Sequence, residues 1–139
     1  MHENAPDGPA PETTRAHLRQ LRLALLRLHK TLLDAERDAY EQARGRVNAG
    51  ELLQLVIHDQ QFAWLHAVSE LVVRIDELLD ADEPATMAEA DALLAQSRAL
   101  LRPAEEGDEF GRKYFAALQR DPSIVLAHRE VTRILAGGS

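Results

Sequence analysis

The stretch LRQLRLALLRLHKTLL, residues 18–33, decides the fold class of this chain. Its leucines recur at alternating steps of three and four residues, which places them on one face of an α-helix. The pattern continues on both sides and predicts a long helix over about residues 14–44. The apolar positions of this seam are Leu18, Leu21, Leu25, Leu28, Leu32, Ala39 and Ala43.

A second long helix is predicted to return antiparallel to the first after a short turn. Gly45 suits the position just past a helix end, and Asn48 with Glu51 forms a capping box for the next helix. We expect this helix over about residues 49–79 as one continuous element. Its main apolar seam is Leu53, Ile57, Trp64, Val68, Leu71, Ile75 and Leu78, and a second stripe holds Leu55, Phe62 and Val73.

Three shorter helices are predicted to follow the hairpin. Thr86 and Glu89 form a capping box that opens a helix to about residue 101. Asp108 is placed to cap a fourth helix, and Asp121 followed by Pro122 starts the last one. No segment alternates apolar and polar residues as a strand does. We therefore expect an all-α fold, in which a long antiparallel helical hairpin plus three shorter helices form an irregular four-helix bundle.

The ends of the chain differ in character from its middle. Residues 1–12 contain Pro6, Pro9 and Pro11 with few apolar groups, and we expect them to be a disordered tail. Residues 13–136 are predicted to form one helical-bundle domain, and residues 137–139 a frayed C-terminus. The 139-residue length fits a single domain with a sizeable core.

Composition excludes several classes of chemistry and location. The chain has no cysteine, so it has neither a disulfide nor a thiolate nucleophile. Residues 1–14 lack the pattern of a signal peptide, and no uncharged apolar run approaches the ~20 residues that span a membrane. We expect a cytoplasmic protein without membrane contact. The net charge is −7, which does not favour nucleic-acid binding.

Charge is unevenly distributed along the chain. Residues 15–46 hold eight basic and four acidic side chains, whereas residues 76–109 hold eleven acidic and two basic ones. The two segments can face each other, or each can simply solvate its own surface. A partner surface of either sign is the other interpretation.

Familiar catalytic and metal-binding motifs are absent. No histidine has a glutamate three residues before it, and neither H-E-x-x-H nor H-x-x-x-H occurs. The segment GDEFG, residues 107–111, is not a phosphate-binding loop, and G-x-S-x-G does not occur. These patterns give no positive indication of an enzyme, and no cofactor is expected.

One group of polar residues on the long helices can be interpreted in two ways. The candidates for a metal or ligand site are His29, Glu36, Tyr40, His66 and Glu70. Glu36 lies near the centre of the leucine seam, where a carboxylate is costly unless it is paired, and Tyr40 one turn later can donate to it. His66 and Glu70 are also one turn apart. The group is either a polar network that fixes helix register or a pocket for a metal ion or small ligand.

The second apolar stripe predicts an interface. The first helix can cover only one face of the second, and the short third helix cannot cover the whole of the other. We expect a homodimer, because a two-fold axis lets one patch serve both subunits. The interface candidates are Leu55, His58, Phe62, His66, Ser69 and Val73.

Two segments resemble small bacterial all-helical proteins of unknown function. They are LLQLVIHDQQFAWLHAVSELVVRIDELLD, residues 52–80, and FGRKYFAALQRDPSIVLAHREVTRIL, residues 110–135. The resemblance implies a bacterial source and a self-contained domain. Our leading hypothesis is a non-enzymatic helical bundle that self-associates and binds another protein. The alternative is a bundle that binds a metal ion or small ligand in a polar pocket between helices.

Overall fold

The computed structural model describes residues 8–137 and shows an all-α protein within them. The seven helices of this part of the chain are α1 (Glu12–Arg44), α2 (Ala49–His58), α3 (Gln60–Ala63), α4 (His66–Asp80), α5 (Met87–Leu100), α6 (Glu109–Arg120) and α7 (Pro122–Gly137). No β-strand occurs between residues 8 and 137, so the predicted fold class is confirmed.

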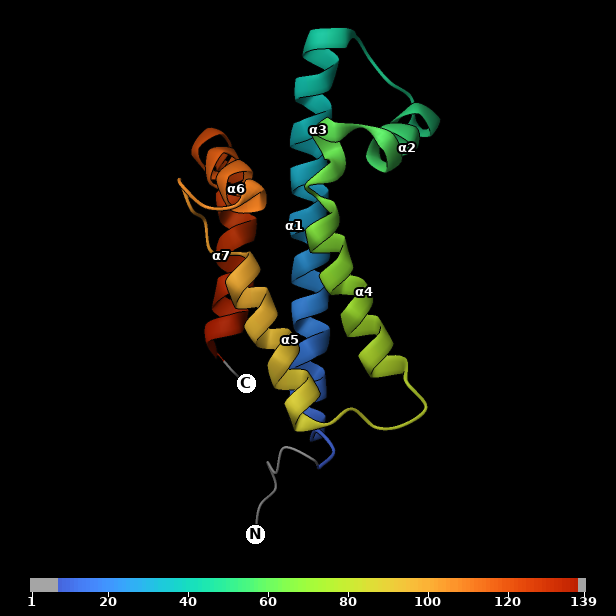
Figure 1. The fold of residues 1–139 in the computed structure, drawn as a ribbon, viewed down its shortest axis with the longest axis vertical. Helices are drawn as coiled ribbons and strands as arrows, with labels where there is room; N and C mark the ends of the chain where they lie inside the picture. The colour runs from blue at the N-terminus through green and yellow to red at the C-terminus, as the bar shows by residue number, and fades with distance from the viewer. Residues whose placement is uncertain (1–7, 138–139) are drawn as a thin grey trace.

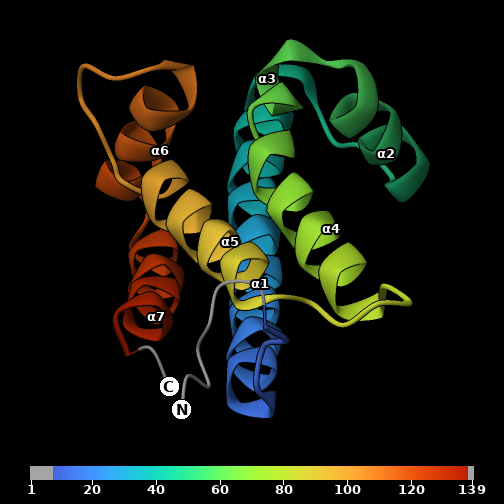
Figure 2. The same cartoon turned by 60° about the horizontal axis from the view of Figure 1, so that its bottom comes forward.

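Helix α1 is the axis of the bundle (Figure 1). Helices α4 and α7 pack along two sides of it, and α5 crosses in front of it in contact with both of them (Figures 1 and 2). Helix α6 packs on α7, whereas α2 projects sideways from the bundle and contacts the short α3. The expected bundle therefore forms, with one helix outside it.

The core follows the leucine seam predicted from the sequence. Every leucine of that seam between Leu18 and Leu32 is at most 1% exposed. Helix α7 contributes its own apolar stripe, which comprises Ile124, Val131, Ile134 and Leu135. His17 joins this interface by donating from Nε2 to the carbonyl oxygen of Ile134 at 2.7 Å, which satisfies an otherwise buried polar ring.

The helix ends lie close to where capping residues predicted them. Gly45 follows α1 with a φ of 95°, a left-handed conformation that glycine adopts without steric cost. The capping box of Asn48 and Glu51 opens α2, and that of Thr86 and Glu89 opens α5. Asp108 caps α6 by accepting from the backbone N–H of Gly111.

The predicted continuous helix over residues 49–79 is wrong. The chain leaves helical geometry at Asp59 (φ −91°, ψ 135°) and forms a tight turn at Trp64 and Leu65 between α3 and α4. Positions 62 and 64 of a straight helix point to nearly opposite sides, since each residue advances 100°. The interruption instead lets Phe62 and Trp64 both enter the core, at 0% and 6% exposure.

Residues 8–11 are bound to the bundle, although we expected them in a disordered tail. The N–H of Ala10 donates to the carbonyl of Ala85 at 2.7 Å, and that of Met87 donates to the carbonyl of Gly8 at 3.0 Å. Residues 1–7 and 138–139, which include most of that tail and of the frayed C-terminus, lie outside the described residues. Among the helices described, none combines the length and apolar character needed to cross a membrane.

Candidate functional site

Glu36 is the centre of a polar cluster that joins α1 to the turn between α3 and α4. The indole Nε1–H of Trp64 donates to Glu36 Oε2 at 2.8 Å, and Gln61 Nε2 donates to Oε1 at 3.3 Å. Lys113 and Arg120 of α6 line a cavity of about 220 Å³ on the same carboxylate. Both carboxylate oxygens are therefore satisfied, which fits a network that fixes how α3 sits on α1.

Tyr40 does not donate to Glu36, so that part of the prediction is wrong. Its ring packs against Phe62 with centroids 6.0 Å apart, and the Arg44 guanidinium lies 5.5 Å from the ring centroid. The donors that replace it come from the segment after Asp59. The sequence alone did not indicate them, because the positions of Gln61 and Trp64 depend on the interruption at Asp59, which the apolar periodicity does not mark.

His29 and His66 form a second cluster between α1 and the start of α4. Burial lowers the pKa of His29, and the nearby His66 lowers it further because two imidazolium charges repel. His66 Nε2 bonds the carbonyl oxygen of Val56 at 3.1 Å, so this ring holds the end of α2 against α4. Glu70 pairs with Arg74 at 3.6 Å and not with His66.

The five residues predicted as a metal or ligand site therefore do not form one site. His29 and His66 are neighbours, Glu36 bonds Trp64 and Gln61, and Glu70 lies in an ion pair. No group of three or more histidine, aspartate or glutamate side chains suited to a metal ion occurs in the part of the chain that the structure describes. The geometry favours the polar-network interpretation over the pocket.

The residues predicted to form one interface also differ in how far the structure buries them. Phe62 is completely buried inside one chain and cannot be part of an interface without unfolding. Leu55 and Ser69 are half-buried, and His58 is exposed at the end of α2. His66, Ser69 and Val73 still share the outer face of α4, because they are spaced by three and four residues.

Helix α2 is the apolar element that the bundle leaves uncovered (Figure 1). Its apolar residues are Ala49, Leu52, Leu53, Leu55, Val56 and Ile57, yet none of the ten residues of this helix is buried. Leu52, Leu55 and Val56 pack partly against the core, whereas Leu53 and Ile57 are 56% and 51% exposed. Both were predicted in the main core seam, and the break at Asp59 removes them from it.

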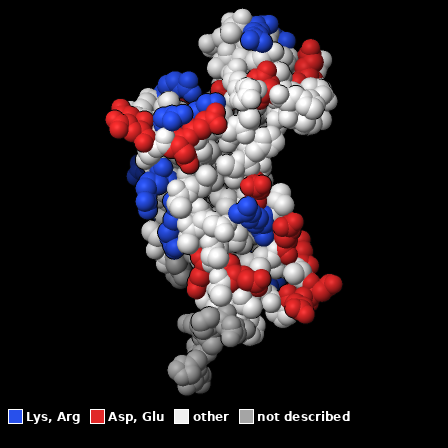
Figure 3. All heavy atoms as spheres, in the orientation of Figure 1, with Lys and Arg blue, Asp and Glu red and all other residues white. Residues whose placement is uncertain are grey.

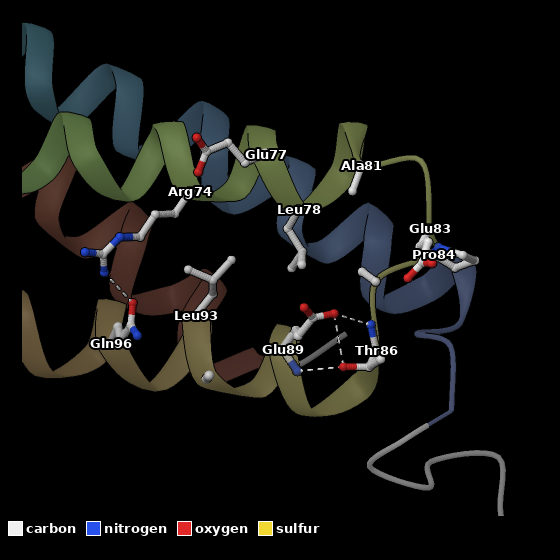
Figure 4. A pocket seen from close by; sticks show the side chains of 12 residues that line it. Arg74, Glu77, Leu78, Ala81, Glu83, Pro84, Thr86, Glu89, Leu93 and Gln96 are labelled. Carbon is white, nitrogen blue, oxygen red and sulfur yellow. Dashed lines mark hydrogen bonds between the residues drawn. The ribbon is translucent and has the colours of Figure 1, made fainter.

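A groove of about 1040 Å³ separates α4 from α5 and is closed at one end by the loop that joins them (Figure 4). Leu78 and Leu93 face each other across it, and Arg74 bridges it by donating to Gln96 at 2.9 Å. Three glutamates, Glu77, Glu83 and Glu89, also line the groove together with Arg74. Because the lining carries both signs of charge, the groove indicates no particular class of ligand.

The two oppositely charged segments of the sequence meet at the ion pair between Arg22 and Asp76. Acidic side chains gather over the C-terminal part of α4 and the following loop (Figure 3). Carboxylates of two neighbouring helices partly neutralise the basic face of α1. Arg22 pairs with Asp76 of α4, and Arg27 pairs with Glu130 of α7. Among the described residues, two of the eight ion pairs join α1 to a neighbouring helix, and the other six lie within single helices.

Comparison with known proteins gives no indication of function. No family model, curated protein or solved structure matches this chain. The resemblance of residues 52–80 and 110–135 to small bacterial helical proteins therefore stays a prediction. Function must be inferred from the chain's own surfaces and cavities.

Proposed function

We propose that this protein is a non-enzymatic helical bundle that binds a second copy of itself, and through the same surface other proteins, with α2 as the binding element. One observation carries the proposal. A helix rich in leucine, isoleucine and valine projects from the bundle with Leu53 and Ile57 about half exposed. Exposed apolar faces of this kind on a soluble domain are typical of association surfaces.

The structure of α2 fits a permanent binding surface. Its N-terminus is closed by a complete capping box, and its C-terminal end is held through the bond from His66 to Val56. Arg37 further secures the preceding turn by donating to the carbonyl oxygen of Val47 at 2.7 Å. A preformed helix loses little conformational entropy when a partner covers it.

A second copy is the occupant that the charges favour. The only carboxylate of α2 is Glu51, although the whole chain carries a net charge of −7. Two copies can therefore approach through α2 around a two-fold axis with little repulsion, and the same patch then serves both subunits. His66 and Val73, on the outer face of α4, extend the surface that such a contact can cover.

Sedimentation equilibrium tests this proposal. We expect the wild type to dimerise and the double variant Leu53→Asp, Ile57→Asp to be monomeric, with an unchanged far-ultraviolet circular dichroism spectrum. Leu126→Asp is the matched control, since Leu126 on α7 is 66% exposed and lies outside the proposed surface. Phe62→Asp is unsuitable, because Phe62 is fully buried and a carboxylate there would unfold the chain.

Two results would contradict the proposal. A wild type that stays monomeric at high micromolar concentration shows that the chain does not self-associate. A dimer that survives in the double variant, or that is lost equally in Leu126→Asp, places the contact elsewhere on the molecule.

A further inference from the structure

A cavity of about 300 Å³ lies between the C-terminal end of α5, the loop that follows it, and α7. Leu101, Pro103, Leu135 and Ala136 supply apolar walls, and Leu101 and Leu135 are themselves only 2% and 4% exposed. The volume falls at the lower end of the range of small-molecule sites in proteins. No residue of this cavity belongs to the Glu36 or His29 clusters.

His128 of α7 lines this cavity and is in contact with Tyr114 of α6. Its Nδ1 lies 2.6 Å from the hydroxyl oxygen of Tyr114, which is completely buried and has no other hydrogen bond among the described residues. Burial raises the pKa of Tyr114, so the phenol keeps its proton. Nδ1 is the acceptor that the structure offers this buried hydroxyl, so we assign the phenol as the donor. The neutral imidazole then carries its own proton on Nε2, the nitrogen left free for another group.

The charged residues that line the cavity are both arginines. Arg98 is engaged, since its Nη2 donates to the carbonyl oxygen of Leu135 at 3.0 Å. Arg102 has no hydrogen-bond or ion-pair partner among the residues described. Neither aspartate nor glutamate lines the cavity within residues 8–137. Apart from Thr132, whose hydroxyl donates to the carbonyl oxygen of Arg129 at 3.1 Å, its polar side chains offer N–H donors and positive charge beside an apolar wall.

We propose that this cavity binds a small organic monocarboxylate with an apolar body. The Arg102 guanidinium and the Nε2–H of His128 receive the carboxylate, and the walls around Leu101 and Leu135 bury the hydrocarbon part. At roughly 30 Å³ for each heavy atom, the volume holds a ligand of about ten heavy atoms. Arginine suits this role because its guanidinium forms paired hydrogen bonds with a carboxylate.

Titration followed by amide chemical shifts tests the site, with octanoate as the probe. Octanoate has about ten heavy atoms, the size estimated for the cavity, and octylammonium is the matched probe with an alkyl chain of similar length and the opposite charge. We expect octanoate to give saturable shifts confined to the residues around Leu101, Thr132 and Ala136. Octylammonium should leave those resonances unmoved, since it meets an arginine and an N–H donor.

Two variants assign the interaction to its residues. Arg102→Gln removes the free positive charge from an exposed side chain and should weaken octanoate binding about tenfold, as loss of a charge-assisted hydrogen bond does. Arg133→Gln is the control, because Arg133 is an exposed arginine on α7 that does not line the cavity, and it should bind as the wild type does.

Three different results would overturn the proposal. Absence of saturable shifts up to about 10 mM octanoate excludes a site of useful affinity. Equal shifts with octylammonium show apolar adsorption without carboxylate recognition, and equal losses in Arg102→Gln and Arg133→Gln show a nonspecific charge effect. The test is independent of α2, so loss of dimerisation and loss of octanoate binding can be observed separately.

Discussion

The bond between Trp64 and Glu36 predicts a specific pattern of stability losses. Trp64 is 6% exposed, donates to Glu36 at 2.8 Å and packs on Phe110 with ring centroids 5.4 Å apart. Trp64→Ala removes both the ring and the donor and should cost ~3–5 kcal/mol in the free energy of unfolding. Trp64→Phe keeps an aromatic ring but removes the N–H.

The expected cost of Trp64→Phe follows from its partner. A hydrogen bond to a charged group contributes about 1.5–3 kcal/mol, and Glu36 is half-buried, so water can replace part of the lost bond. We therefore expect a loss of about 1–2 kcal/mol for Trp64→Phe, and a coupling of similar size in a double-mutant cycle with Glu36→Ala.

Urea unfolding followed by far-ultraviolet circular dichroism measures these losses. Fluorescence cannot follow every variant, because Trp64 is the only tryptophan in the chain. Tyr40→Phe is the control. Its hydroxyl does not bond Glu36, so the loss should stay below about 0.5 kcal/mol.

A loss below about 1 kcal/mol for Trp64→Ala would place the ring at the surface and contradict its burial. A cycle without coupling between Trp64 and Glu36 would contradict the hydrogen bond between them. A loss in Tyr40→Phe as large as that in Trp64→Phe would restore Tyr40 as the partner of Glu36.

Two further predictions concern the turn before α2 and the half-buried His29 of α1. Gly45→Ala should lower the free energy of unfolding by about 1 kcal/mol because Gly45 has a φ of 95°, whereas Gly50→Ala, inside α2 with ordinary contacts, should raise it by about 0.5 kcal/mol; equal effects in urea unfolding would contradict this backbone explanation. Burial, and then the nearby His66, lower the pKa of His29 in the folded state below 6.5. As the pH falls, the unfolded chain therefore binds this proton before the folded chain does. The free energy of unfolding consequently decreases as the pH falls from 6.5 toward the lowered pKa. His29→Gln should reduce that loss between about pH 7 and about pH 5, and an unchanged pH dependence of the urea midpoint would contradict the assignment.

Most of the helical architecture could be predicted because its signals are local. A capping residue satisfies N–H groups within its own first turn, so Asn48, Thr86 and Asp108 mark helix starts wherever the helices finally pack. The leucine seam of α1 was equally readable, because a period close to 3.6 residues needs no knowledge of the partner helices.

The candidate site was only partly predictable. Glu36 was correctly identified as a carboxylate that needs partners, but the partners themselves, Trp64 and Gln61, depend on where the next segment bends. The hydrogen bond between Tyr114 and His128 joins two helices, α6 and α7, whose relative packing no local pattern specifies. Cavities depend in the same way on how helix ends meet.

The sequence by itself determined that this protein is helical, where most of its helices begin, and which face of α1 is buried. Only the tertiary structure decided that the second predicted helix breaks at Asp59. Local periodicity favours one straight seam through Leu53, Ile57 and Trp64, but a straight helix cannot bury both Phe62 and Trp64 against α1. The straight seam would bury Trp64 with Leu53 and Ile57, whereas the break at Asp59 buries Phe62 together with Trp64 and packs their rings against Tyr40 and Phe110. It also gives Glu36 two hydrogen-bond donors, from Gln61 and Trp64. That exchange places Leu53 and Ile57 on the outside, where we propose that a second copy binds.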